Sequence, residues 1–454
     1  MTTDAAWEWA DWGDVTWARM DTPTQPMVVT IMLLLATPLD EERLKATLQD
    51  RLLTFARFRQ QLAKRGMRRV WVEDAAFDLN DHLEWRRLPE AVDQPALEAL
   101  VGEIASQPLA VNRPLWRCVV VENAGAGSAI VFRVHHCIAD GIALLRVFLT
   151  LTDRTPHLDE ASAAQAATLE ERRIQARLAA KTTKVIQSPP SGRERLRWGA
   201  AFLTALLRQA WLLPDTRTTL RGPLNGRKRM AWTAPIPLSD IADIRQRLGG
   251  RVNDVMLTAV AGALGRYLQA RGEMRPGLTI RWVVPVNLRP YQEEIQLGNE
   301  FAVIFLKLPL DIPDPVARLA AVRARMERVK TSPEAVANRA LIRTVGRLPD
   351  RLERWMIRLF GTKATAVLTN VPGPEETLYL AGARVARGLA WVPQITGIGV
   401  GFCVLSYAGA ITVGVTTDSG VVAEPGELAA GFEAEIAELA TRAGQLCIAN
   451  NPND

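Results

Sequence analysis

Short apolar runs with the character of buried strands recur along the whole chain, and they constrain its fold more than any other feature of the sequence. They include MVVTIMLLL (Met27 to Leu35), LWRCVVVEN, SAIVFRVHH, LTIRWVVPVNLRP, EFAVIFLKLPL and VGFCVLSYAGAITVGVTTD. Segments with helical spacing of apolar residues separate them, such as QPALEALVGEIASQPL, VNDVMLTAVAGALGRYLQARG and GELAAGFEAEIAELATRA. Strands mixed with helices in this way predict an α/β or α+β protein.

A chain of 454 residues is long enough for two or three domains. The patterns divide into two mixed units, at residues 1–155 and 230–454, joined by a crossover at 156–229. Fourteen lysines and arginines, against three acidic residues, fall between Glu171 and Arg229, although the net charge of the whole chain is only +6. The longest apolar runs cover about ten residues, half of what a membrane span needs, so we expect no transmembrane segment.

Within the crossover, residues 193–213 have the pattern of an amphipathic helix with Trp198 and Trp211 near its ends. One interpretation is a solvated linker whose apolar face packs on the protein itself. The alternative is a helix that lies in an anionic lipid interface, where apolar burial and arginine attraction add, or one whose arginines contact the phosphates of a ligand. No nucleic-acid-binding motif accompanies the charge, so we expect no nucleic-acid partner.

The four cysteines lie far apart and form no C-x-x-C pair, so the sequence predicts neither a disulfide framework nor a zinc ribbon. The first residues, MTTDAAWEWADWGD, are acidic and rich in tryptophan, unlike the basic start and apolar run of a signal peptide. We therefore expect a cytoplasmic protein.

Two of the four histidines are adjacent, at the end of the predicted strand IVFRVHH. Neighbouring side chains of a strand point to opposite sides, so one of His135 and His136 can face a cavity while the other packs inward. Asp140 and Gly141 follow in a turn, where a carboxylate can anchor the loop and glycine allows close approach. No third ligand stands at a spacing that suits a metal, whereas a neutral histidine is the usual general base near neutral pH. The chain has no G-x-S-x-G elbow, which favours direct transfer over a covalent serine intermediate.

The segment HHCIADG resembles the HHxxxDG motif of the CoA-dependent acyltransferase superfamily. The rest of the chain resembles bacterial wax ester synthase/acyl-CoA:diacylglycerol acyltransferases nearly end to end. The matching segments are Pro26-Met27, ARFRQQL, FDLNDHL, Pro114-Leu115-Trp116, Asn253-Asp254, VPVNLR ending at Arg289, LGNEFAV, TNVPGP with Asn370-Val371-Pro372, and SYAGAITVGVTTD. The chain departs from the family's pattern in its N-terminal segment, at Val28 and at Cys137, positions that bear on substrate choice more than on the base.

The resemblance implies two chloramphenicol-acetyltransferase-like domains, with mixed sheets flanked by helices and an active-site tunnel at their interface. It implies an O-acyltransferase that moves a long-chain acyl group from acyl-CoA to a fatty alcohol, giving a wax ester, or to a diacylglycerol, giving a triacylglycerol. Acyl-CoA is then a co-substrate, and no metal or redox cofactor is expected. The alternatives are another small or polyketide alcohol as acceptor, and a catalytically silent protein that binds lipid or coats lipid droplets. The implied location is cytoplasmic, at the inner membrane or a lipid inclusion, with residues 193–213 as the lipid contact.

The resemblance also assigns roles to the motif around the histidines. His136 is the implied general base, and strand alternation makes His135 structural. Asp140 orients the loop by pairing with Arg289, since a charge-assisted pair fixes geometry. Gly141 leaves room for the substrate.

Other motif residues are expected around the tunnel. Asn253 helps to hold the tetrahedral oxyanion, or else Asn253 and Asp254 cap the helix that follows, and both interpretations stay open. Pro114-Leu115-Trp116 and Asn370-Val371-Pro372 are expected to shape the wall of the substrate channel.

Overall fold

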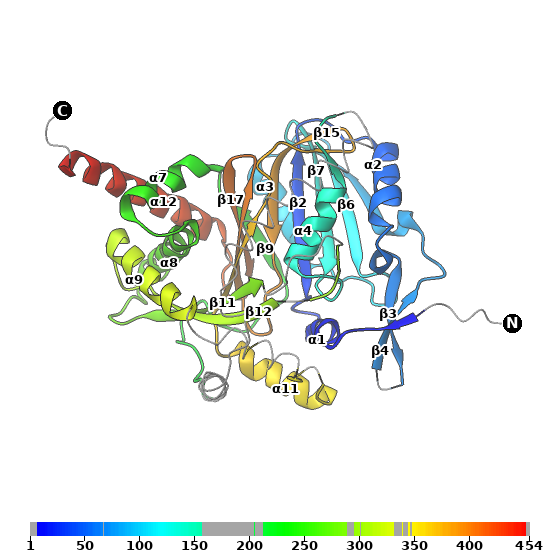
Figure 1. Cartoon of the computed structure of the whole chain (residues 1–454), viewed down its shortest axis with the longest axis horizontal. Coiled ribbons are helices and arrows are strands. Elements are labelled where there is room, and N and C mark those ends of the chain that lie inside the picture. Colours follow the sequence, from blue (N-terminus) through cyan, green and yellow to red (C-terminus); the bar gives the residue numbers. More distant parts are fainter. Residues whose placement is uncertain are drawn as a thin grey trace, which may run out of the picture.

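The computed structural model describes residues 7–66, 68–156, 204, 212–287, 295–299, 301–330, 338, 344–345 and 347–450. Two large sheets stand side by side in the middle of the molecule, and helices flank them (Figure 1). The mixed α/β class predicted from the strand and helix patterns is therefore confirmed. No helix in the described ranges is both long and apolar enough to cross a bilayer.

The first sheet has the strand order β5-β6-β7-β2-β15-β14-β8. Its strands are β5 (Leu83–Arg87), β6 (Trp116–Ala124), β7 (Gly127–His135), β2 (Val28–Leu35), β15 (Ala383–Trp391), β14 (Tyr379–Leu380) and β8 (Thr152–Asp153). The turn between β6 and β7 includes Gly125 at φ 70°, a conformation that glycine adopts without strain. β2 pairs antiparallel with β7 on one side and with β15 on the other, so a strand from the C-terminal region completes this sheet. The domain division at residues 155 and 230 stays a prediction.

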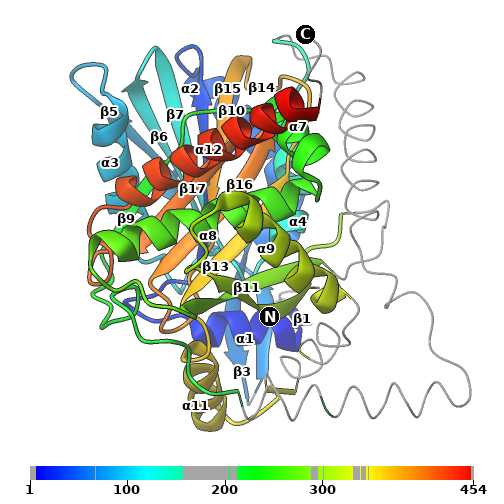
Figure 2. The same ribbon diagram turned by 90° about the vertical axis from the view of Figure 1, so that its left-hand side faces the viewer.

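The second sheet has the order β10-β17-β16-β13-β11-β12, with β9 also paired to β17. Its strands are β9 (Lys228–Trp232), β10 (Ile236–Pro237), β11 (Thr279–Asn287), β12 (Phe301–Pro309), β13 (Ala366–Pro372), β16 (Val400–Tyr407) and β17 (Ala410–Asp418). The helices packed on it are α7 (Leu238–Leu248), α8 (Val252–Ala270), α9 (Pro315–Lys330) and α12 (Gly426–Asn450). Figure 2 shows α12 and α8 side by side across the strands β16 and β17.

Smaller elements complete the N-terminal region. The helices are α1 (Trp12–Met20), α2 (Glu41–Thr47), α3 (Gln94–Ser106) and α4 (Gly141–Thr150), with short turns η1 (Leu48–Leu52), η2 (Ala56–Phe58) and η3 (Leu79–His82). The strands β1 (Trp7–Trp9), β4 (Arg68–Glu73) and β3 (Gln60–Arg65) form a separate small sheet in that order. From later in the chain, α11 (Asp350–Gly361) packs against α1. Apolar residues of α3 pack against β9 and belong to one buried cluster with Met32 of β2, so α3 joins the cores of the two halves.

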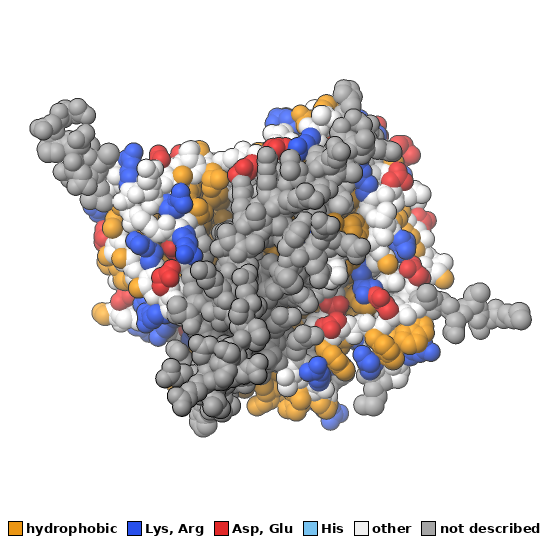
Figure 3. Space-filling view, in the orientation of Figure 1, with side chains coloured by type: hydrophobic (Ala, Val, Ile, Leu, Met, Phe, Trp, Pro, Cys, Tyr) orange, Lys and Arg blue, Asp and Glu red, His pale blue; other side chains and the backbone are white. Residues whose placement is uncertain are grey.

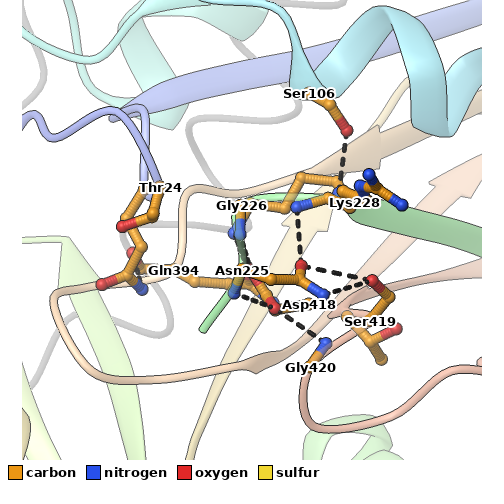
Figure 4. A network of polar contacts seen from close by, with 12 residues as sticks. Thr24, Ser106, Asn225, Gly226, Lys228, Gln394, Asp418, Ser419 and Gly420 are labelled. Carbon is orange, nitrogen blue, oxygen red and sulfur yellow. Dashed lines mark hydrogen bonds and ion pairs between the residues drawn. The ribbon is translucent and has the colours of Figure 1, made fainter. Parts of the chain in front are cut away.

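A buried polar network ties the end of the crossover to the second sheet (Figure 4). Asp418, the last residue of β17, is fully buried. Its carboxylate oxygens accept hydrogen bonds of 2.9 to 3.0 Å from the backbone N–H groups of Asn225, Gly226 and Gly420. Lys228 Nζ lies 3.7 Å from Asp418 Oδ2. Because donors and a cation surround the carboxylate, its burial is compatible with a stable fold.

Candidate active site

The two adjacent histidines lie against different cavities, as the strand pattern predicts. β7 ends at His135, whose backbone N–H donates to Leu115 O at 2.9 Å, and the N–H of His136 donates to Met27 O at 2.8 Å. The His136 side chain lines a cavity of about 580 Å³ between the two sheets. The His135 side chain lines a smaller cavity together with Leu115.

His135 is held by local contacts. Its Nδ1 accepts a hydrogen bond of 3.1 Å from the backbone N–H of Cys137, and its Nε2 lies 3.5 Å from Asp21 Oδ1. These contacts join the turn after β7 to the segment that follows α1. They support a structural role for His135.

Asn299 determines which nitrogen of His136 carries the proton. Asn299 Nδ2 lies 2.8 Å from the backbone carbonyl of His136, which can only accept, and 2.9 Å from Asp14 Oδ1. The amide oxygen is therefore the atom that faces His136 Nδ1, at 2.8 Å. Since an amide oxygen cannot donate, Nδ1 of the neutral imidazole carries the hydrogen and Nε2 carries the lone pair. The basic nitrogen of neutral His136 is therefore Nε2.

Helix α1 brings two side chains to this site. Asp14 and Trp17 are three residues apart and so lie on the same face of the helix. The Trp17 ring stacks on the imidazole of His136, with ring centroids 3.9 Å apart and planes 13° apart. The indole covers one face of the imidazole, and this contact restricts the ring orientation and excludes water.

Burial shifts the pKa values of both titratable groups in this chain of contacts. It lowers the pKa of His136 from 6.5 to about 4, and the nearby Asp140 carboxylate and the Asn299 hydrogen bond oppose that shift only in part. It raises the pKa of Asp14 from 3.8 to about 7, against the hydrogen bond from Asn299. At neutral pH the imidazole is therefore uncharged and able to accept a proton, and Asp14 titrates close to neutrality.

Asp140 and Gly141 connect the site to α4. Asp140 Oδ1 accepts from the backbone N–H groups of Ile142 and Ala143 at 3.1 and 2.9 Å, and the carboxylate thereby caps the helix. Apart from its chain neighbours and the backbone of its own helix, no described atom lies within 4 Å of the position that a Cβ on Gly141 would occupy, so the residue borders open space in the cavity. The predicted pairing of Asp140 with Arg289 stays a prediction, because Arg289 lies outside the described residues.

The cavity draws its walls from both halves of the chain, where the resemblance implies a tunnel. Its lining is mainly apolar and comes from β2, α4, β13, β15 and β16, with Val29, Ile31, Leu33, Leu145, Phe148, Val367, Val385 and Leu405 among the contributing side chains. Arg245 and Arg251 line it where α7 ends and α8 begins, and both are exposed. One part of an apolar cavity is therefore positively charged and open to solvent.

The two residues of the Asn253-Asp254 pair lie in different surroundings. Helix α8 begins at Val252, earlier than the predicted start at Asn253 or Asp254, because Asp254 Oδ2 reaches back to accept from the backbone N–H of Arg251 at 2.9 Å. Asn253 lines the cavity, and its Oδ1 lies 3.4 Å from Asn370 Nδ2. Asp254 thus secures the helix terminus, and the oxyanion role of Asn253 stays a prediction.

The two proline-containing motifs also lie in different places relative to the cavity. Among the described residues, Asn370 and Val371 line the cavity of His136, whereas Pro114, Leu115, Trp116 and Pro372 do not. Trp116 lies on the same face of the sheet as Val29 but two strands away, where its Nε1 donates to Phe58 O at 2.8 Å and its ring stacks on His82. The first motif therefore supports the backbone of His135 through Leu115.

Three residues of the site were not among those expected from the sequence: Asp14, Trp17 and Asn299. Asp14 and Trp17 fall in the N-terminal segment that departs from the family's pattern, and Asn299 is part of LGNEFAV but carries no titratable group. The acidic and tryptophan-rich composition before residue 20 is the sequence feature that could have indicated a contribution of α1 to the site. Residues 193–203 and 205–211 of the predicted amphipathic helix lie outside the described residues.

Comparisons with protein families match almost the whole chain. Residues 13–256 match the model of the wax ester synthase/diacylglycerol acyltransferase catalytic domain, and residues 297–440 match that of the WS/DGAT C-terminal domain. A probable diacylglycerol O-acyltransferase, tgs1, of Mycobacterium tuberculosis is 30% identical over 418 residues, 88% of each chain. A putative diacylglycerol O-acyltransferase of the same organism, Rv3087, is 30% identical over 82% of each chain.

Solved structures with the same fold include a wax ester synthase/diacylglycerol acyltransferase from Marinobacter aquaeolei. It superposes with a TM-score of 0.70 at 22% identity, over 96% of this chain and 100% of that one. The first condensation domain of the calcium-dependent antibiotic synthetase superposes with a TM-score of 0.60 at 15% identity, over 97% of each chain. At these identities the structural likeness shows the fold alone.

Proposed function

We propose that this chain, which belongs to the wax ester synthase/diacylglycerol acyltransferase family, transfers a long-chain acyl group from acyl-CoA to a hydrophobic alcohol with His136 as the general base. Membership of the family makes the protein an acyltransferase. The acceptor is a fatty alcohol, a diacylglycerol, or both. The observation that carries the role of His136 is its contact with Asn299, which fixes the tautomer with the lone pair at Nε2, on a side chain that lines an apolar cavity.

The reaction needs one proton carrier. His136 Nε2 accepts the hydroxyl proton while the alcohol oxygen attacks the thioester carbon, and a tetrahedral oxyanion forms. The C–S bond then breaks, the ester is released, and the CoA thiolate takes the proton back from Nε2. The nearby Asp140 carboxylate stabilises the transient imidazolium, and Asn299 keeps Nδ1–H in place.

We test this proposal by thiol release from palmitoyl-CoA with hexadecanol, with dioleoylglycerol and with no acceptor. His136→Ala is expected to lower the acceptor-dependent rate by about 10²- to 10⁴-fold. His135→Asn is the matched control, because its amide oxygen can accept the Cys137 N–H as His135 Nδ1 does. If neither acceptor supports thiol release, the acceptor is another alcohol or the protein is a silent lipid-binding protein. Unchanged release in His136→Ala contradicts the role of this histidine.

The donor enters beside Arg245 and Arg251. CoA is a polyanion, and two exposed arginines next to the N-terminus of α8 form a positive region that suits phosphates. Arg245→Glu with Arg251→Glu is expected to raise KM for palmitoyl-CoA about tenfold and to leave KM for the acceptor unchanged. Palmitoyl-pantetheine lacks the nucleotide phosphates, so its KM should not respond. An equal rise for both thioesters contradicts this assignment.

The protein works in the cytoplasm at the inner membrane or at a lipid inclusion, where its acceptor and product reside. The predicted contact through residues 193–213 is tested by vesicle flotation of a variant with Arg193, Arg195, Arg197 and Arg208 changed to Glu. Flotation equal to that of the wild type contradicts the contact through this segment.

A further inference from the structure

The large apolar side chains that are exposed in the described part of the chain gather at one end of the molecule. They are Trp7, Trp9, Val111, Leu213, Leu352 and Trp355. Trp7 and Trp9 lie on β1, and Val111 borders the small sheet to which β1 belongs. Leu213 is close to the end of α11, and Leu352 and Trp355 lie on α11. α11 and β3 are at the lower end in both Figure 1 and Figure 2, and β4 lies beside β3 in Figure 1. In Figure 3, hydrophobic side chains alternate with Lys and Arg along this edge.

Helix α11 presents a mixed face of apolar and positive side chains. Leu352 and Trp355 lie one turn apart and are 45% and 58% exposed. Arg351, Arg354 and Arg358 are exposed beside them. Arginine and tryptophan side chains on the same side of an amphipathic helix are typical of helices that lie at a lipid interface.

The other face of α11 is fixed to the active-site helix. Glu353 is fully buried and forms an ion pair of 2.5 Å with Arg19 of α1. α1 in turn carries Asp14 and Trp17 to His136. The exposed face of α11 is therefore on the outside of the layer that closes the site.

The small sheet repeats this chemistry next to α1. Arg65 lies over the Trp7 ring at 4.0 Å, and Arg68 lies over the Trp9 ring at 4.2 Å. Stacked in this way, each pair combines an apolar ring with a positive charge in one exposed position. Glu8, between these two tryptophans on β1, is exposed, and its carboxylate pairs with Arg57.

We infer that these two elements form a docking face for an anionic lipid surface, made by Trp7, Trp9, Arg65, Arg68, Arg351, Leu352, Arg354, Trp355 and Arg358. The inference rests on the proposed function in one respect: the proposed acceptor is located in a lipid phase, so the protein would bind a lipid surface to reach it. The positive charge complements phosphatidylglycerol headgroups, and the tryptophans and Leu352 enter the interface. A second copy of the chain fits less well, because the same face would bring arginine against arginine.

The test is flotation with vesicles of phosphatidylcholine, with and without phosphatidylglycerol. Changing Arg351, Arg354 and Arg358 to Glu should reduce partitioning onto anionic vesicles at least about 100-fold, since each arginine near an anionic leaflet contributes about fivefold. Leu352→Ser with Trp355→Ser should reduce it roughly 10- to 100-fold on anionic vesicles at any salt concentration. High salt should lower the partitioning of the wild type onto anionic vesicles toward that of the arginine variant.

The matched control reverses Arg87, Arg384 and Arg442, which are exposed on β5, β15 and α12, away from the docking face. This variant has the same change in net charge and should float almost as well as the wild type. If it loses as much binding as the variant with Arg351, Arg354 and Arg358 changed to Glu, net charge alone drives association and the proposed docking face is contradicted. Flotation of both α11 variants equal to the wild type also overturns the proposal.

Activity separates this inference from the proposed function. With a short-chain acyl-CoA and a short-chain alcohol, both in solution, the α11 variants should match the wild type. With dioleoylglycerol presented in vesicles, they should lose about as much activity as they lose binding. Loss of both activities with retained flotation points to damage at α1 and contradicts a docking role, whereas an inactive wild type that still floats contradicts only the proposed function.

Discussion

Asp14 and Asp418 are both buried carboxylates, but their surroundings differ in the number of donors. Asp418 accepts from three backbone N–H groups and lies 3.7 Å from Lys228 Nζ. Asp14 accepts from the Asn299 amide beside His136, and burial raises its pKa to about 7. A carboxylate surrounded by donors and a cation belongs to the framework of the fold. One with few donors is able to change its charge near neutral pH, which suits a site that handles protons.

The largest expected effect is the loss of the Asp418 charge. Asp418→Asn removes the negative charge beside the buried Lys228 ammonium, which keeps its hydrogen bond to Gln394 Oε1. We expect the free energy of unfolding to fall by about 3 to 5 kcal/mol. Denaturant unfolding at pH 8 measures this change. Asp14→Asn is the matched control and should not be destabilised at that pH. Equal losses in the two variants contradict the contrast between the two carboxylates.

The next effect concerns the residue between Asp14 and His136. Asn299→Ala removes the acceptor for His136 Nδ1–H, so the ring is no longer fixed with its lone pair at Nε2. We expect kcat to fall about 10- to 100-fold, with less change in KM. A rise in KM alone, at unchanged kcat, indicates that Asn299 only shapes the cavity.

A smaller effect is expected from Asp14→Asn. Asp14 ionises with a pKa of about 7, and its charge favours the imidazolium through the Asn299 amide. The wild-type kcat should therefore rise up to about tenfold as the pH passes through 7, and the variant should stay on the lower plateau. A profile of kcat from pH 5 to 9 measures the difference. An unchanged rise in the variant assigns that titration to another group.

The last effect is a pair of opposite slopes in stability. Asp14 has a raised pKa in the folded state, so its contribution is fully present below 3.8 and is lost as the pH rises toward 7. His136 has a lowered pKa, so its contribution grows as the pH rises from about 4 to 6.5. The two nearly cancel in the wild type between these values. His136→Ala should therefore lose stability with rising pH, and Asp14→Asn should gain it, at up to about 1.4 kcal/mol per pH unit.

Thermal unfolding between pH 4.5 and 6.5 measures both slopes, and the double variant should be as flat as the wild type. Slopes of the same sign in the two single variants contradict the pKa shifts of this site.

The sequence predicts much of the fold because the strands and helices carry strong local patterns, and it predicts His136 because the motif is contiguous. The polar contacts of His136 do not follow from local pattern. Asn299 is 163 residues from His136 and 285 from Asp14, and only tertiary packing brings them together. The start of α8 differs by one or two residues because Asp254 reaches back to Arg251, a choice between cap positions that residue type alone does not decide. Trp116 lies away from the cavity because β7 separates its strand, β6, from β2, and this strand order is likewise a tertiary feature.

The position of β15 has a consequence for how the protein is made. β2, near the start of the chain, pairs with β15 at residues 383–391, so its edge stays open while the ribosome adds more than three hundred further residues. An unpaired apolar strand edge is a template for aggregation. During translation the nascent chain must therefore shield this edge, or be held by a chaperone, until the C-terminal region emerges and the first sheet closes.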